Sequence, residues 1–168
     1  MILYNVHISH KFHLKKPENK KANTLILFIA NIVVFIIWSL IMSVTAMDLV
    51  ATAKQTISVC DIETAKSALS SHLILDVREP AEYAVGFLPG AINIPRGVLE
   101  FKINAHPAFQ GKQNANIIVY CLTGGRSALA VEALNKLGYN NAISMDGGFT
   151  SWKENGLEVA FSPESCQN

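Results

Sequence analysis

The sequence predicts an α/β domain with a mostly parallel sheet, and two observations support this prediction. Short apolar runs typical of buried strands alternate with segments whose apolar residues recur at helical spacing. Strands that alternate with helices are typical of parallel sheets covered on both faces. The composition agrees, because 50% of the 168 residues are hydrophobic and 16% are charged. We therefore expect one folded domain preceded by an extension, and not a disordered chain.

The folded domain is expected over 59–160, and its elements can be assigned in order. Acidic or proline residues mark helix starts, and glycines mark helix ends. Four short apolar runs are typical of strands. The expected elements are a helix over 61–69, a strand over 72–77, a helix over 80–86, a turn at 89–90, a strand over 91–94, a helix over 97–103, a strand over 116–121, a helix over 127–138, a strand and turn over 141–148 and a helix over 149–156.

The first 47 residues differ from the rest in charge and hydropathy. Residues 1–23 hold five lysines and one acid, about +4, although the whole chain carries only +1. The remainder therefore carries about −3, which argues against a nucleic-acid partner. Residues 24–47 contain no charged side chain, and Asn31 is their one strongly polar residue. Such a stretch predicts a hydrophobic helix long enough to span a membrane.

Two roles for residues 24–47 remain open. One is a signal peptide cleaved near the small residues of 44–46 or 51–53, and the other is an uncleaved transmembrane anchor. The segment is longer than the ~7–15 residues of a signal core, which favours the anchor. In both cases the preceding lysines keep the N-terminus in the cytoplasm, so the domain is exported to the periplasm or another extracytoplasmic space. Residues 48–58 are expected to be a linker, and 161–168 a C-terminal tail.

The stretch VYCLTGGRSAL places Cys121 between a predicted strand and a predicted helix. Gly124 and Gly125 allow backbone N–H groups to converge, and the helix N-terminus at Ser127 favours an anion at the same place. Arg126 adds a positive charge. These groups favour a thiolate, which is the nucleophilic form of cysteine. The pattern indicates a nucleophile in an anion-binding loop, although a lone cysteine without such surroundings is most often a buried small hydrophobe.

The other two cysteines, Cys60 and Cys166, lie near the two ends of the folded part. If the domain is exported, a disulfide between them could persist, but the sequence favours two unpaired cysteines. No pair has C-x-x-C spacing and no histidine clusters beside a cysteine, so no metal ion is expected.

Three stretches resemble rhodanese-like domains, the sulfurtransferase family, and the resemblance covers residues 59–160. The stretches are LILDVREPAEYAVGFLPGAINIP, IIVYCLTGGRSALAVEALNKLGY and MDGGFTSW. They are similar to the family's Asp-x-Arg strand end and Gly-x-x-Pro-Gly-Ala turn, to its active-site loop and following helix, and to its Gly-Gly-x-x-x-Trp closing motif. The resemblance implies a central, mostly parallel five-stranded sheet flanked by helices.

The resemblance also implies a sulfurtransferase reaction at Cys121. In the family, this cysteine takes sulfane sulfur from a small donor, such as thiosulfate or a persulfide, and passes it to a thiol or cyanide acceptor. No cofactor is implied. Asp76 and Arg78 match residues that support the loop structurally. The residues expected to bind the persulfide and the donor are Leu122, Thr123, Gly124, Gly125, Arg126 and Ser127.

The chain departs from the family pattern at Phe87, where histidine is usual, and at Leu122, where many single-domain members have arginine. The second departure removes a positive charge, which favours a less charged donor or a persulfide-bearing protein over thiosulfate. Two other functions stay open. One is a cysteine phosphatase or arsenate reductase, whose loops place five residues between Cys and Arg where this chain has four. The other is a non-catalytic binding or persulfide-carrier module.

Overall fold

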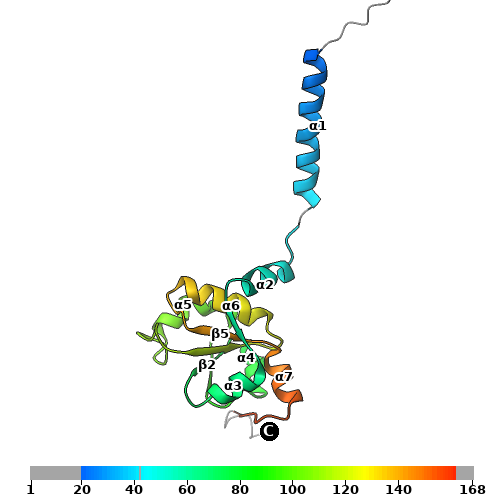
Figure 1. Ribbon diagram of the computed structural model, residues 1–168. Helices are drawn as coiled ribbons and strands as arrows, with labels where there is room; N and C mark the ends of the chain where they lie inside the picture. The colour runs from blue at the N-terminus through cyan, green and yellow to red at the C-terminus, as the bar shows by residue number, and fades with distance from the viewer. Residues whose placement is uncertain (1–19, 42, 162–168) are drawn as a thin grey trace, which may run out of the picture. The chain divides into compact units, whose positions relative to one another are not determined.

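The structure, a computed structural model, describes residues 20–41 and 43–161 (Figure 1). These residues fall into two compact units divided after Ser43. The first contains α1 (Lys20–Ile41), and the second contains the other helices and strands described. Most of the expected basic extension and nearly all of the expected tail, including Cys166, lie outside the described residues.

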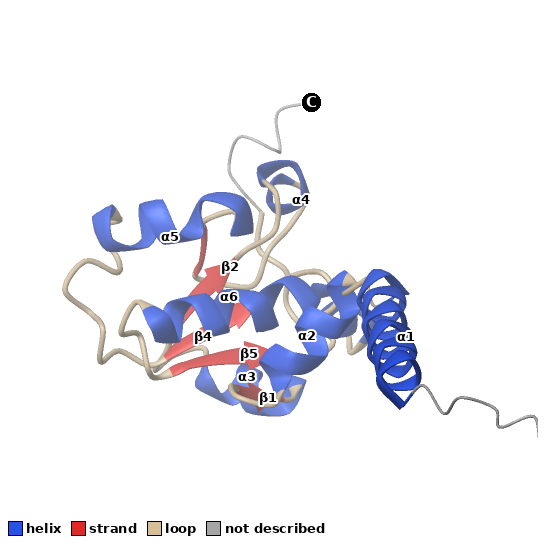
Figure 2. Ribbon diagram, turned by 90° about the horizontal axis from the view of Figure 1, so that it is seen from above, coloured by secondary structure: helices blue, strands red, loops and turns tan. Residues whose placement is uncertain are grey.

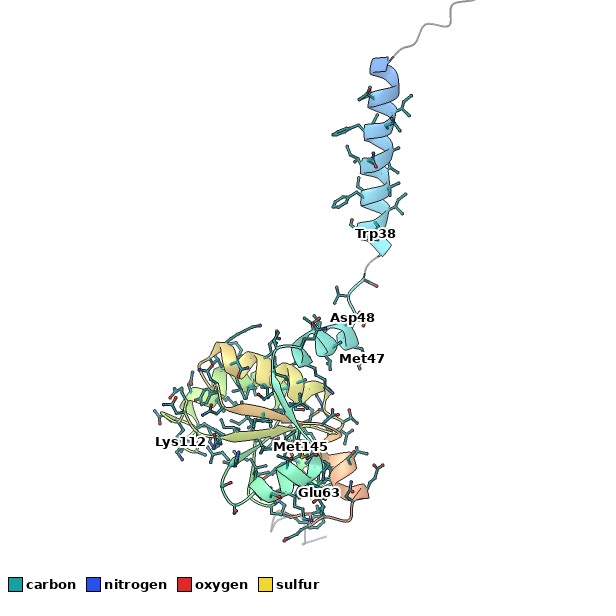
Figure 3. All side chains as sticks on the ribbon, viewed as in Figure 1. Trp38, Met47, Asp48, Glu63, Lys112 and Met145 are labelled. Atoms are coloured by element: carbon teal, nitrogen blue, oxygen red, sulfur yellow. The ribbon has the colours of Figure 1, made fainter. Side chains whose placement is uncertain are left out.

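Helix α1 exposes its apolar side chains. The large hydrophobic residues within 25–38 are each at least 44% exposed, and Figure 3 shows them projecting around the helix. The amide of Asn31 donates to the carbonyl oxygen of Leu27 at 2.9 Å, so this polar side chain is satisfied inside the helix. The expected segment 24–47 is not a single element, because α1 ends at Ile41 and 43–45 are not helical. In the described ranges, we find no helix with the length and apolar character that crossing a membrane requires.

The second unit is built on a five-stranded sheet whose strands all run parallel, in the order β1-β5-β4-β2-β3. The expected α/β class and five-stranded sheet are therefore confirmed. The strands are β1 (Ser58–Cys60), β2 (Leu73–Asp76), β3 (Ala91–Asn93), β4 (Ile117–Tyr120) and β5 (Ala142–Met145). The helices are α2 (Ala46–Lys54), α3 (Ile62–Ala68), α4 (Pro80–Ala84), α5 (Leu99–Lys102), α6 (Gly125–Lys136) and α7 (Gly148–Glu154), with 3₁₀ turns η1 (Arg96–Val98) and η2 (Ile103–Ala105).

The side chains of β4 alternate between two cores. Ile117, Val119 and the following Cys121 belong to the core beneath α6, whereas Ile118 and Tyr120 belong to the core that contains residues of α3 and α7. Figure 1 shows α5 and α6 on one side of the sheet and α3 and α7 on the other, and Figure 2 looks down on α6 where it crosses the sheet. Burial on both faces explains why β4 is apolar throughout.

The expected linker over 48–58 is incorrect, because these residues fold as part of the domain. Thr45 caps α2, with its Oγ1 accepting from the N–H of Asp48 at 3.2 Å while the Asp48 carboxylate accepts from the N–H of Thr45 at 2.8 Å. Val50 and Ala53 are buried, and α2 packs against α6 (Figure 2). The strand β1 then begins at Ser58.

The other differences from the expected elements are local. The helix expected over 97–103 is divided into η1, α5 and η2. Helix α6 begins at Gly125, two residues before the expected start. The remaining expected strands and helices are present within one to three residues of their predicted bounds.

Candidate active site

Cys121 directly follows β4, the central strand of the sheet, and is 1% exposed. Its Sγ accepts a hydrogen bond from the backbone N–H of Gly124 at 3.2 Å, and its thiol is directed to the hydroxyl oxygen of Ser127 at 3.8 Å. A backbone N–H aimed at sulfur stabilises the thiolate, which is the reactive form. The sulfur therefore has polar partners at the carboxyl end of a strand, where ligands bind in open parallel sheets.

Gly124 shapes the loop that follows Cys121. Its φ of +100° lies in the left-handed region, and it serves as the N-cap residue of α6. A Cβ at this position would lie 3.1 Å from Oδ1 of Asp146, so a side chain is disfavoured sterically as well as conformationally. Leu122 and Thr123 are exposed, while Gly124 is buried beneath them. The turn thus directs one buried N–H onto the sulfur and starts α6, whose N-terminus favours negative charge.

Two buried hydroxyl groups lie next to the sulfur. The Ser127 hydroxyl donates to the carbonyl oxygen of Gly124 at 3.1 Å and accepts from the hydroxyl of Ser144 at 2.9 Å. Ser127 is 0% exposed and Ser144 is 1% exposed. Ser144 lies on β5 and was not among the predicted site residues, although a polar residue within the apolar run of β5 is a signal that could have indicated it. The pair fixes the hydroxyl orientation beside Cys121.

Helix α7 holds the first residues of the loop from the other side. The backbone N–H of Phe149 donates to the carbonyl oxygen of Cys121 at 2.8 Å, and that of Thr150 donates to the carbonyl oxygen of Leu122 at 3.0 Å. Gly147 and Gly148 both have positive φ, and a Cβ on Gly148 would lie 2.5 Å from the Cys121 oxygen. Gly148 is therefore required for α7 to approach the loop backbone, whereas a Cβ on Gly147 would meet the side chain of Ser151 within α7.

Asp76 and Arg78 form a fully buried ion pair next to the loop. The Asp76 carboxylate accepts from Nη2 of Arg78 at 2.6 Å and from its backbone N–H at 2.8 Å. The same guanidinium donates to the carbonyl oxygens of Glu82 and Gly86 at 3.2 and 2.8 Å. It also lies 4.0 Å from the ring centroid of Phe149. Arg78 thus links β2 to α4 and α7, an arrangement consistent with the predicted supporting role.

Arg126 does not carry an isolated charge at the loop. Its Nη1 and Nη2 donate to the two carboxylate oxygens of Glu82 at 2.6 and 2.8 Å. Hydrogen bonding to Arg126 lowers the pKa of Glu82 from 4.5 to about 2, and the same bonds raise the pKa of Arg126. Both groups are therefore charged over the neutral range, and each offsets the other. No sequence pattern indicated this partner, which lies 44 residues away in the chain.

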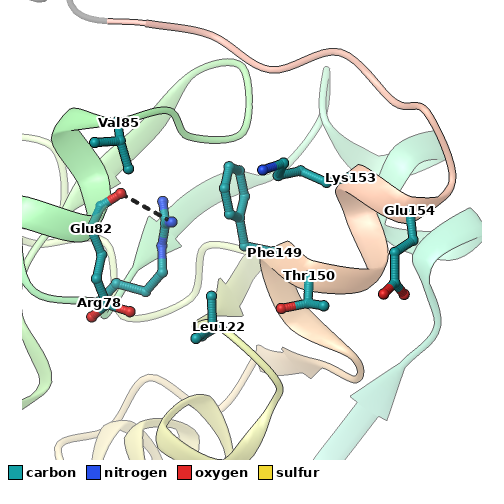
Figure 4. Close-up of a pocket in the computed structure, with 8 residues that line it drawn as sticks. All are labelled: Arg78, Glu82, Val85, Leu122, Phe149, Thr150, Lys153 and Glu154. Carbon is teal, nitrogen blue, oxygen red and sulfur yellow. Dashed lines mark hydrogen bonds between the residues drawn. The ribbon is translucent and has the colours of Figure 1, made fainter.

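A pocket of about 500 Å³ lies beside the loop between α4 and α7 (Figure 4). Cys121 does not line it, and Leu122 connects the pocket with the loop. Of the predicted site residues, only Leu122 and Arg78 are part of its wall. The lining residues are Arg78, Glu82, Val85, Leu122, Phe149, Thr150, Lys153 and Glu154.

Of the predicted loop residues, Gly124 and Ser127 contact the Cys121 sulfur, whereas Leu122 and Thr123 are exposed and Arg126 is bonded to Glu82. Cys60 is partly buried on β1 and is a free cysteine, as is Cys121. Over residues 20–41 and 43–161, we find no cluster of three or more His, Cys, Asp or Glu side chains suited to a metal ion.

The sheet is parallel, and a buried cysteine follows its central strand in a loop that contains glycine. These features place the chain in a class of α/β domains with a cysteine loop at the carboxyl end of the sheet. The model of the rhodanese-like domain matches residues 61–155, more than half of the chain. The chain therefore belongs to the rhodanese-like domain family, as the three motifs predicted.

Several of the proteins that the chain is similar to are described as sulfurtransferases. The chain is 39% identical over 98 residues to thiosulfate sulfurtransferase 16, chloroplastic, of Arabidopsis thaliana, covering 53% of this chain and 80% of that protein. It is 30% identical over 92 residues to a sulfurtransferase of Allochromatium vinosum, covering 55% and 80%. Among solved structures, it resembles a Rhodopseudomonas palustris protein of unknown function described as a possible tyrosine phosphatase. That match has a TM-score of 0.63 and 29% identity, and it covers 71% of this chain and 96% of the other.

Proposed function

We propose that this protein is a sulfurtransferase that carries sulfane sulfur as a persulfide on Cys121. The observation that carries the proposal is the Sγ of Cys121 at the end of β4, with the N–H of Gly124 aimed at it from 3.2 Å. The sulfurtransferases of 30 and 39% identity support the same chemistry. A short loop with four residues between Cys121 and Arg126 forms a small cradle, which suits a sulfur atom.

The transfer takes two balanced steps. In the first, the Cys121 thiolate attacks the sulfane sulfur of the donor, a new S–S bond forms, and the electron pair of the broken bond leaves with the rest of the donor, as sulfite when thiosulfate is used. In the second, a thiolate or cyanide attacks the outer sulfur of the persulfide, and the electron pair returns to Cys121. The N–H of Gly124 and the N-terminus of α6 stabilise negative sulfur in both states.

The preferred donor is proposed to be an organic persulfide or thiosulfonate of low charge. Leu122 contributes no cation to the loop, and Arg126 is compensated by Glu82. The neighbouring pocket offers apolar surface from Val85 and Phe149, which can hold an organic group on the donor (Figure 4). These features support a donor with an apolar body over a small dianion.

Mass spectrometry of the full-length protein tests the proposal. After exposure to thiosulfate or an alkyl persulfide, wild type should gain one sulfur atom on Cys121 and should release it to cyanide or a thiol. Cys121→Ser should abolish both steps. Cys60→Ser is the matched control, because it removes a free, partly buried cysteine on β1, and it should behave as wild type.

Two alternatives make different predictions in the same assays. A non-catalytic binding module would gain no sulfur from any donor, and a passive carrier would gain sulfur without turnover. A cysteine phosphatase or arsenate reductase would act on its oxyanion substrate without sulfur transfer. The Rhodopseudomonas palustris structure described as a possible tyrosine phosphatase is the reason to include phosphate esters among the substrates assayed.

We also propose the exported location that the sequence predicts. The support is the uncharged stretch over 24–41 and the excess of lysine before it. Fusion of a periplasmic reporter enzyme after residue 161 should be active in a bacterial host, whereas activity of a cytoplasmic reporter at that site would contradict the proposal. N-terminal sequencing of the expressed protein distinguishes a cleaved signal from an uncleaved anchor.

A further inference from the structure

The ion pair between Arg126 and Glu82 lies at the edge of the active-site loop. Arg126 is the second residue of α6, and Glu82 belongs to α4. The two side chains meet through two hydrogen bonds, at 2.6 and 2.8 Å, and about a third of each side chain is exposed. This is the planar, two-point geometry in which arginine binds a carboxylate or a similar oxyanion most strongly. Glu82 thus occupies the face of Arg126 that an anionic donor would otherwise use.

Glu82 is held in this position from two further sides. Its carboxylate oxygen Oε2 also accepts from the backbone N–H of Glu79 at 3.0 Å, and its backbone carbonyl accepts from Arg78 at 3.2 Å. Figure 4 shows this last contact at the wall of the pocket. Because α4 fixes both the backbone and the carboxylate of Glu82, an incoming anion must compete with a pre-organised partner.

The other charged side chains that line the pocket are Arg78, Lys153 and Glu154. The guanidinium of Arg78 is buried against Asp76. The Lys153 ammonium lies 5.8 Å from the ring centroid of Phe149, and Glu154 follows it on the pocket wall. Because Arg78 and Lys153 are positive and Glu82 and Glu154 are negative, the net charge of the side chains that line the pocket is zero.

We propose that Glu82 is a specificity-determining residue that disfavours dianionic sulfur donors by occupying Arg126. This inference rests on the proposed sulfurtransferase function. A thiosulfate dianion that approaches the Cys121 thiolate adds two negative charges next to a third, and it meets Glu82 instead of a free guanidinium. A monoanionic thiosulfonate meets half of that repulsion. The S–S bond that forms on Cys121 is the same for both donors, but the electron pair of the broken bond leaves with sulfite from thiosulfate and with methanesulfinate from the thiosulfonate. This intrinsic difference is the same in every variant, so a change in the donor ratio between variants reports the effect of charge.

The test compares thiosulfate with methanethiosulfonate, in which a methyl group replaces one charged oxygen. For the full-length protein, the ratio of kcat/KM for thiosulfate to kcat/KM for methanethiosulfonate should rise about five- to tenfold in Glu82→Gln. Because the ratio is taken within one protein sample, partial loss of folded protein cancels. Arg126→Gln introduced into Glu82→Gln should return the ratio to the wild-type value.

Glu132→Gln is the matched control. Glu132 lies on the same helix as Arg126, is also paired with a cation, Lys136, and loses the same charge on substitution. Its ratio should stay within about twofold of wild type. A Glu82→Gln ratio that changes by less than about twofold, or an equal change in the Glu132 variant, overturns the role of Glu82 while leaving sulfur transfer intact. Absence of transfer from both donors in wild type overturns the proposed function and this inference together.

Discussion

Gly148 provides the sharpest test of how α7 supports the loop. An alanine Cβ there would lie 2.5 Å from the carbonyl oxygen of Cys121 and 2.6 Å from that of Leu122, both backbone atoms. The residue also has φ +58°, which costs a non-glycine residue about 1–2 kcal/mol. Overpacking against a fixed backbone costs a further ~1–3 kcal/mol. Gly148→Ala should therefore lower the free energy of unfolding by about 2–5 kcal/mol.

Gly156→Ala separates the two contributions. Gly156 has φ +67°, but an added Cβ would meet no atom within 4 Å, so this variant should lose only about 1–2 kcal/mol. Urea unfolding can be followed by the fluorescence of Trp152, which is 1% exposed, in a Trp38→Phe background that removes the exposed second tryptophan. If Gly148→Ala costs no more than Gly156→Ala, the steric argument for α7 against the loop is refuted. Gly148→Ala should also slow persulfide formation, because its clash is with the loop itself.

Three further predictions concern the surrounding groups. Asp76→Asn removes the charge that neutralises the buried Arg78 and should cost about 3–5 kcal/mol in urea unfolding; a cost below about 1 kcal/mol would contradict the assigned pair. Hydrogen bonds from its arginine partner lower the pKa of Glu82 from 4.5 to about 2, so its contribution to stability is present above pH 4.5 and is lost as the pH falls towards about 2. The free energy of unfolding, measured from pH 5 down to about 2, should therefore fall by roughly 1 kcal/mol more in wild type than in Glu82→Gln, after allowing for solvent screening. Ser144→Ala removes the hydroxyl that donates to Ser127 and should lower the free energy of unfolding by about 1 kcal/mol. It should also slow persulfide formation, measured by mass spectrometry. An unchanged rate would show that the orientation of the Ser127 hydroxyl does not depend on Ser144.

The fold was largely predictable because its signals are local. Apolar runs of four to six residues, separated by glycine and proline turns, indicated four of the five parallel strands. The missing strand, β1, has only three residues and lies at the edge of the sheet, where Val59 is 42% exposed and no apolar run is needed. Helix α2 was also missed, although the Thr-x-x-Asp pattern at Thr45–Asp48 is a helix-start signal. Its position at the end of a long apolar stretch concealed it.

Only those parts of the candidate site that are close together in the sequence could be predicted. The sequence placed Cys121, the glycine turn and the helix N-terminus together because they are neighbours in one loop. It could not show that Glu82 binds Arg126 or that Ser144 contacts Ser127, because these partners meet only after the strands are ordered in the sheet. The sequence indicated that Arg126 adds a positive charge to the loop, but it did not indicate that Glu82 neutralises this charge in the folded domain.

The arrangement of charges explains what the loop can attract. Arg78 is paired with Asp76, Arg126 with Glu82, and on the remaining side Lys54 is paired with Asp146 at 2.7 Å. In the proposed reaction, the negative charge of the Cys121 thiolate or persulfide is stabilised mainly by oriented backbone dipoles. These act at short range on the sulfur itself, and they neither titrate nor draw distant anions. Under the proposed function, such a site stabilises the transferred sulfur but attracts a dianion only weakly. We therefore propose that the donor is recognised by the neighbouring pocket and by the counter-charge of Glu82.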